Sequence, residues 1–144
     1  MFDYESRVNE LSGNRFCCSQ ILMNLSLDLI GCEDPEIRRR LVRAMNGLCG
    51  GVGGSRNNCG ALTGAACGIG LICGRGETEE VAHPEMSPMV KALIQWFTSE
   101  YGSIECCDIV EEDRASRLAK CPGLMKATFE NMVRIMLENG VAID

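Results

Sequence analysis

The chain has 144 residues, a length that fits one hydrophobic core, so we expect a single domain over residues 1–144. Its formal net charge of −6 at pH 7 disfavours approach to a phosphate backbone, which argues against nucleic acid as a partner. No apolar run follows a basic start, and the longest weakly polar stretch, 61–73, is broken by glycines and too short to cross a bilayer. These features predict a soluble, cytoplasmic protein that does not bind membranes.

Helical periodicity dominates the first part of the chain. Asp34 is a suitable N-cap and Pro35 a suitable first helical residue, so a helix is predicted over 35–46. Its basic residues (Arg38, Arg39, Arg40 and Arg43) are interpreted as a solvated face. An earlier helix is predicted over 15–30, with apolar side chains at three- and four-residue spacing: Cys18, Ile21, Leu22, Leu25 and Leu29.

A glycine-rich stretch, 47–54, precedes a third predicted helix over 58–73. Within that helix Gly60, Gly64 and Gly68 recur every four residues and therefore share one face. Each glycine weakens a helix by roughly 1 kcal/mol relative to alanine, so the pattern is understandable where something packs very closely against that face. The face predicts either the seam of a homodimer or a groove filled by another helix of the same chain.

Two further helices are predicted over 87–101 and 122–139, the first ended by Gly102 and the second opened by Pro122. Between them lie a short helical turn near 103–107 and a weaker helical segment at 114–120. No segment shows the alternation typical of strands. The expected fold class is all-α, a compact single-domain bundle of about five principal helices with a Gly-rich loop before the third.

Ten cysteines are the unusual feature of the composition. In a reducing cytosol structural disulfides are not expected, and metal binding or redox chemistry is the better interpretation. About half of the cysteines are expected to be small buried apolar residues. The absence of C-x-x-C and C-x-x-C-H argues against a thioredoxin-type motif, a zinc knuckle and covalent haem, and the single histidine, His83, cannot supply a histidine-based metal site.

Four of the cysteines occupy positions that suit a shared site. Cys59 begins the third helix, Cys106 lies in a first helical turn and Cys121 precedes Pro122, so all three are expected at helix starts. Free amide groups and the helix dipole there stabilise a thiolate. Cys18 belongs to an inward-facing stripe. We therefore predict that these four side chains converge around one redox centre or one cluster.

Four segments (16–20, 50–64, 101–106 and Cys121) together resemble the C-GCAxxG-C-C family, small proteins described as redox-active and named for four spaced cysteines. The glycine- and alanine-containing element reads Cys59-Gly60-Ala61-x-x-Gly64 in this chain, a small departure from the order in the family name. The resemblance implies a catalytic or metal-binding set of Cys18, Cys59, Cys106 and Cys121, with Gly60, Ala61 and Gly64 beside any cofactor. A similar cysteine pattern accompanies an iron–sulfur cluster in split-Soret cytochromes, whose haem-attachment sequence this chain lacks.

Three functions are compatible with these observations. The first is a thiol–disulfide redox protein, in which a thiolate such as Cys59 attacks and a second cysteine resolves. The second is a four-cysteine metal or iron–sulfur protein, and the third is a non-catalytic helical module whose cysteines are core residues. The doublets Cys17-Cys18 and Cys106-Cys107 leave the choice of ligand open, and neither a substrate nor a redox partner follows from the sequence.

Overall fold

The structure, a computed structural model, describes residues 3–143, which form seven α-helices, one 3-10 helix and no strand. The all-α class is confirmed, although the bundle has more helices than the five expected. Among the described residues, no helix combines the length and apolar character needed to cross a membrane. The helices are α1 (Tyr4–Gly13), α2 (Cys18–Leu29), α3 (Pro35–Ala44), η1 (Met45–Leu48), α4 (Gly60–Cys73), α5 (Met86–Tyr101), α6 (Cys106–Ile109) and α7 (Arg114–Glu138).

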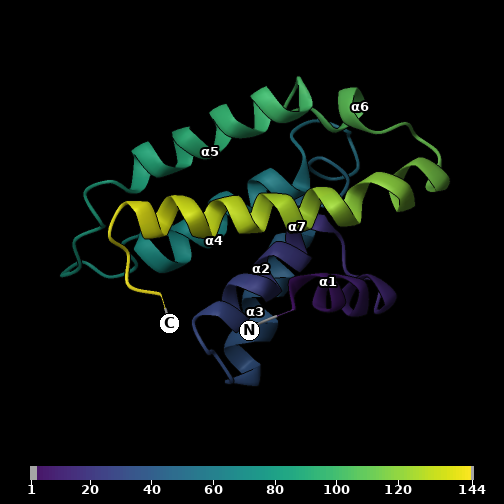
Figure 1. The fold of residues 1–144 in the computed structure, drawn as a ribbon. Coiled ribbons are helices and arrows are strands. Elements are labelled where there is room, and N and C mark those ends of the chain that lie inside the picture. The colour runs from purple at the N-terminus through teal and green to yellow at the C-terminus, as the bar shows by residue number, and fades with distance from the viewer. Residues whose placement is uncertain (1–2, 144) are drawn as a thin grey trace.

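The glycine-rich helix α4 lies at the centre of the bundle and contacts α2, α5 and α7 (Figure 1). Each of these helices contributes fully buried apolar side chains to one core, because its apolar positions share a face. Gly31 has a φ of 68° and Gly102 a φ of 78°, so both predicted helix ends adopt the left-handed conformation that favours glycine. The core includes Leu22, Leu25, Ile69, Phe97, Phe129 and Met132.

The glycine face of α4 is filled by α2 of the same chain. A Cβ atom added at Gly64 would lie 2.8 Å from the Leu22 Cβ and 2.9 Å from the Ser19 Cα. A side chain at Gly68 would likewise collide with Ser26. The glycines therefore allow close packing of α2 on α4. Because α2 covers this glycine face, the face is not available as the seam of a homodimer.

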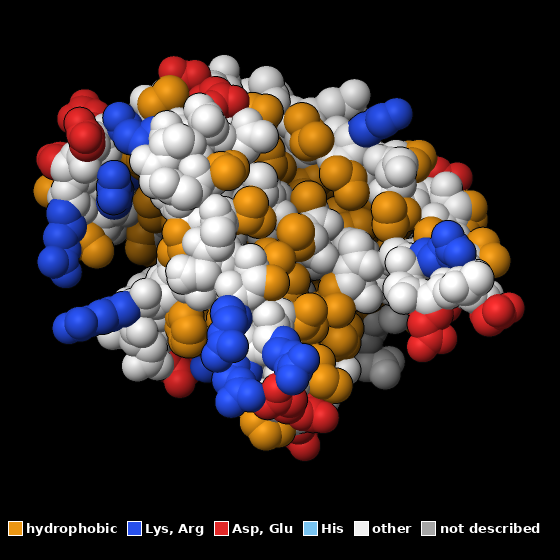
Figure 2. All heavy atoms as spheres, turned by 180° about the vertical axis from the view of Figure 1, so that it is seen from behind, with side chains coloured by type: hydrophobic (Ala, Val, Ile, Leu, Met, Phe, Trp, Pro, Cys, Tyr) orange, Lys and Arg blue, Asp and Glu red, His pale blue; other side chains and the backbone are white. Residues whose placement is uncertain are grey.

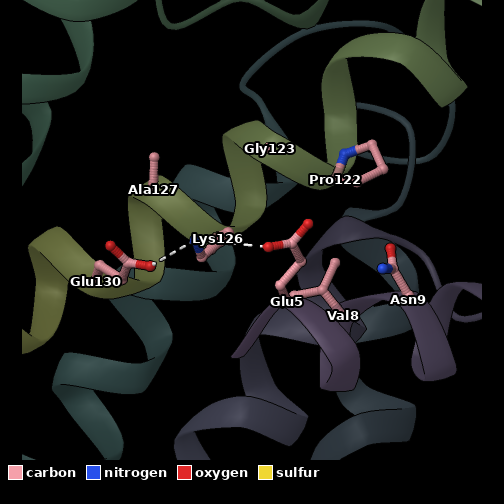
Figure 3. Close-up of a pocket in the computed structure, with 8 residues that line it drawn as sticks. All are labelled: Glu5, Val8, Asn9, Pro122, Gly123, Lys126, Ala127 and Glu130. Atoms are coloured by element: carbon pink, nitrogen blue, oxygen red, sulfur yellow. Dashed lines mark ion pairs between the residues drawn. The ribbon is translucent and has the colours of Figure 1, made fainter. Parts of the chain in front are cut away.

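Helix α1 was not among the predicted helices. The Asp3 carboxylate caps it by accepting a hydrogen bond from the Ser6 N–H at 3.1 Å, and Val8 and Leu11 are buried. Across a cleft of about 340 Å³ it faces α7, where Lys126 lies 3.9 Å from Glu5 and 3.5 Å from Glu130 (Figure 3). The Asp3 cap and the Val8–Leu11 spacing were the available signals, but polar residues dominate this segment.

The last helix begins at Arg114, so the prediction that Pro122 opens it was wrong. Asp113 caps the earlier start, because its carboxylate accepts a hydrogen bond from the Ser116 N–H at 3.2 Å. Pro122 lies inside the helix, where the missing N–H and the ring cost about 3 kcal/mol. Burial of the apolar face that follows, including Met125 and Phe129, offsets this cost.

Candidate redox site

A short pairing between two loops brings Cys59 beside Cys106. The Cys59 N–H donates to the Ile104 carbonyl at 2.8 Å, and the Cys106 N–H donates to the Asn57 carbonyl at 2.6 Å. Asn58 and Glu105 form the bridge between these two bonds. Figure 1 shows the loop before α4 lying next to α6, although the two are far apart in the sequence.

The glycine-rich run forms a left-handed turn that prepares this pairing. Five consecutive residues, 50–54, have φ between 62° and 75°, a conformation that costs a residue with a Cβ about 1–2 kcal/mol. Four of the five are glycines, and Val52 is the exception. The Asn57 N–H donates to the Gly51 carbonyl at 2.9 Å, so the turn fixes the residues that pair with the Cys106 segment.

Cys18 and Cys121 complete the group. Cys18 is the first residue of α2 and Cys121 lies within α7, and their sulfurs share a hydrogen-bonding interaction. Charge on Cys59 or Cys106 also raises the pKa of Cys18, so all four predicted cysteines lie close enough to influence one another. Of the other doublet members, Cys17 forms a disulfide elsewhere and Cys107 is exposed.

The contact between Cys18 and Cys121 shifts their two pKa values in opposite directions. The interaction with Cys121, together with burial, raises the pKa of Cys18 well above its ordinary value. The same interaction, supported by the positive charge of Arg117, lowers the pKa of Cys121 to about 7. Cys121 is therefore the member of the pair that ionises first, while Cys18 keeps its proton.

Cys59 does not have the lowered pKa that its place at a helix start suggested. Burial raises the pKa of this thiol, and the backbone N–H groups of Ala61 and Leu62 offset only part of that effect. For Cys121 a stabilised thiolate was predicted, and its pKa is indeed lowered, but the predicted cause, a helix start, is wrong. Cys121 lies well inside α7, so its neighbours Cys18 and Arg117 stabilise its thiolate in place of a helix N-terminus.

The glycine- and alanine-containing element positions Cys59. A Cβ at Gly60 would lie 3.2 Å from the Cys18 Cβ and 3.3 Å from the Ser19 N, so glycine lets α2 approach the start of α4. Gly64 has the same role one turn later. The Ala61 N–H donates a hydrogen bond to the Cys59 sulfur, which favours the thiolate. A contact between Gly60, Ala61 or Gly64 and a cofactor stays a prediction.

One disulfide was not expected from the sequence. Cys17 and Cys49 are bonded, with their Cα atoms 5.6 Å apart. This bond corrects the expectation that these cysteines would not form structural disulfides. A sequence separation of 32 residues does not single out this pair, because Cys73 and Cys106 are separated by a similar length of chain and stay free.

The four converging thiols are suitable donors for zinc or for an iron–sulfur cluster. However, no three His, Cys, Asp or Glu side chains within residues 3–143 are arranged so that they could hold a metal ion. A cluster would need the sulfurs to move closer together.

The fold and the site define a small all-helical protein with four clustered cysteines. Residues 16–135 match the model of a family described as "Putative redox-active protein (C_GCAxxG_C_C)". The chain belongs to this family, as its cysteine pattern implied. No curated protein and no solved structure matches the chain.

Proposed function

We propose that this protein is a thiol–disulfide redox protein in which Cys121 is the attacking thiolate and Cys18 is the resolving cysteine. The observation that carries the proposal is the interacting pair itself, with the pKa of Cys121 at about 7 and that of Cys18 raised. An attacking thiol is most effective when its pKa lies near the ambient pH, because thiolate content and nucleophilicity are then balanced. Cys121 is also only half-buried, in contrast to the buried Cys59.

The reaction has two exchange steps. The Cys121 thiolate attacks one sulfur of a substrate disulfide, forms a mixed disulfide and releases the other sulfur as a thiolate. Cys18 then loses its proton, attacks the Cys121 sulfur and expels the second substrate thiolate. The substrate gains two electrons and the protein gains a Cys18–Cys121 disulfide. Cys59 and Cys106 border this pair, and the charge on each affects the protonation of Cys18.

The test is to oxidise the reduced chain with bis(2-hydroxyethyl) disulfide and to map the new bonds by peptide mass spectrometry. We expect a Cys18–Cys121 disulfide in the wild type and a mixed disulfide trapped on Cys121 in Cys18→Ser. Cys107→Ser is the control, because Cys107 is exposed and should leave the pattern unchanged. Oxidation that leaves both Cys18 and Cys121 as free thiols would refute the proposal.

A four-cysteine metal or iron–sulfur site is the second candidate. Four thiols that form no disulfide with one another lie near each other, although their present arrangement does not hold a metal ion. In it the same residues (Cys18, Cys59, Cys106 and Cys121) would be the ligands. Anaerobic purification followed by metal and acid-labile sulfide analysis separates the two candidates. Stoichiometric iron and sulfide that are lost in Cys59→Ser would establish this candidate in place of the first.

A further inference from the structure

The Cys17–Cys49 disulfide lies beside a groove that is separate from the four-thiol site. The groove lies between α2 and α3 and has a volume of about 500 Å³, within the range of small-molecule sites. Each half-cystine adjoins its wall: the Cys17 N–H donates to the Gln20 side chain at 3.2 Å, and the Cys49 N–H donates to the Asn46 carbonyl at 3.2 Å. Both Gln20 and Asn46 line the groove.

The groove combines an apolar floor with a basic rim. Phe16 and Val42 supply apolar surface, while three arginines of α3 line the same space. Arg38 is held by Asp28 at 2.7 Å, and Arg39 pairs with Glu36. Arg43 is exposed and forms no ion pair among the residues that the structure describes. Figure 2 shows Lys and Arg side chains near the end of the molecule where α3 lies, with Asp and Glu side chains beside them and hydrophobic ones next to them.

This positive rim is unusual in a chain with a net charge of −6. A ligand that complements it has to be anionic and small enough for the groove. A ligand that makes use of the adjacent disulfide has to carry a thiol. Cys17 and Cys49 are both half-buried and adjoin the groove through Gln20 and Asn46, so a thiol held at that wall would lie next to the disulfide-bonded residues.

We propose that the groove binds a low-molecular-weight thiol bearing carboxylates, which reduces the Cys17–Cys49 disulfide by exchange. The ligand thiolate attacks one sulfur of the disulfide, forms a mixed disulfide with that cysteine and releases the other cysteine. A second ligand thiolate attacks the ligand sulfur of the mixed disulfide and frees the protein. Two ligand thiols are thereby oxidised to one ligand disulfide, and Cys17 and Cys49 are reduced to thiols.

Ser19 is placed to stabilise the reduced cysteines after the exchange. Its buried Oγ lies 3.3 Å from the Cys17 sulfur and 4.0 Å from the Cys49 sulfur. The hydroxyl donates its own hydrogen to the Met45 carbonyl at 2.8 Å. The oxygen lone pairs can therefore accept the S–H of the released cysteine once it is protonated.

The test compares two thiols that differ in charge: glutathione and glutathione diethyl ester. The full-length Cys121→Ser variant is used with its Cys17–Cys49 disulfide intact, so that a Cys18–Cys121 disulfide cannot form and the proposed function does not affect the result. Reduction of the Cys17–Cys49 disulfide is followed by alkylation and mass spectrometry at low ionic strength. Electrostatic attraction commonly raises association rates by tenfold or more, so we expect glutathione to react roughly tenfold faster than its ester.

In the Arg39→Gln/Arg43→Gln variant this ratio should fall to about one, as it should at high salt. Both arginines are exposed, so the substitutions should not affect folding, and circular dichroism verifies this. Arg75→Gln/Arg114→Gln is the control, because it removes the same charge from residues outside the groove and should keep the ratio. Equal rates for the two thiols, or a preference that survives both loss of the arginines and high salt, would overturn the proposal.

Discussion

At the scale of single residues, the chemistry depends on how one pair of sulfurs shares protons. Burial alone would raise the pKa of both Cys18 and Cys121, because it disfavours the thiolate. Contact between the sulfurs raises the pKa of Cys18 further but lowers that of Cys121, because a protonated Cys18 stabilises the charge on the Cys121 thiolate. Arg117, one helical turn before Cys121, adds a positive charge on the same side of the pair.

Alkylation by iodoacetamide should therefore show one cysteine whose reactivity rises with pH through a midpoint of about 7. The pKa of Cys121 is lowered, so its thiolate forms above that pH and is lost below it. Cys121→Ser should abolish this phase, while Cys107→Ser should keep it. Cys18→Ala should move the midpoint upward, because it removes the interaction that stabilises the thiolate. An unshifted midpoint in Cys18→Ala would show that Cys18 does not control the acidity of Cys121.

At the scale of elements, glycine has two distinct uses in this chain. In α4 it removes side-chain volume so that α2 can approach, and in the loop before α4 it permits positive φ. Both uses serve the site, since α2 carries Cys18 and the loop leads to Cys59. Each can be tested with a matched pair of glycines.

Gly64→Ala should lower the free energy of unfolding by about 1–3 kcal/mol, the usual cost of overpacking a core. The added methyl would lie 2.9 Å from the Ser19 Cα, and backbone cannot move aside as a flexible side chain can. Gly70→Ala is the control in the same helix, with nothing within 4 Å of its Cβ, and it should stabilise by about 0.5–1 kcal/mol. Urea unfolding measures both. Equal effects of the two substitutions would contradict the packing explanation.

In the loop, Gly51→Ala should be more harmful than Gly53→Ala. Both residues have positive φ, so each substitution should cost about 1–2 kcal/mol in backbone strain. A Cβ at Gly51 would also lie 2.6 Å from the Asn57 N, whereas one at Gly53 has open space. Chemical denaturation measures the difference in stability. Amide hydrogen exchange should also show loss of protection at Cys59 and Cys106 in Gly51→Ala alone, and unchanged protection there would refute the role assigned to the turn.

At the scale of the whole molecule, three kinds of long-range contact hold the site together. The core packs α4 against α2, α5 and α7, the loop pairing joins residues near 57 to residues near 105, and the disulfide ties the start of α2 to the start of the glycine-rich loop. The disulfide and the four-thiol site adjoin through Cys17 and Cys18, which are neighbours in the chain.

Removing the disulfide should lower the stability of the oxidised protein. A bond that closes a loop of this length contributes about 3–4 kcal/mol by restricting the unfolded chain, with a separation of 32 residues between Cys17 and Cys49. Cys49→Ser should therefore unfold at lower urea concentration than the wild type without reductant. With reductant the two proteins should differ little, and a large difference that persists would show that Cys49 contributes mainly through packing.

The sequence by itself determined the fold class, most of the helices and the family. Periodicity and caps are local properties, so segments such as Asp34-Pro35 and the apolar stripe of α2 could be interpreted from neighbouring residues. Expected helix starts and the resemblance to the family likewise indicated Cys18, Cys59, Cys106 and Cys121, with Cys17 and Cys107 left open as alternatives. One error arose where tertiary packing overrides a local rule. Proline favours a first helical turn, but burial of the apolar face that follows Pro122 offsets the cost of its place inside α7.

Only the tertiary structure decided which sulfurs meet and which of them carries charge. The pairing of Cys17 with Cys49, the contact of Cys18 with Cys121 and the cover that α2 gives to the glycine face all join residues distant in the chain. The acidity of Cys121 and the raised pKa of Cys59 depend on burial and on neighbours from other elements. Local sequence contains neither quantity, because desolvation and charge–charge interactions are set by the surroundings that the folded chain creates.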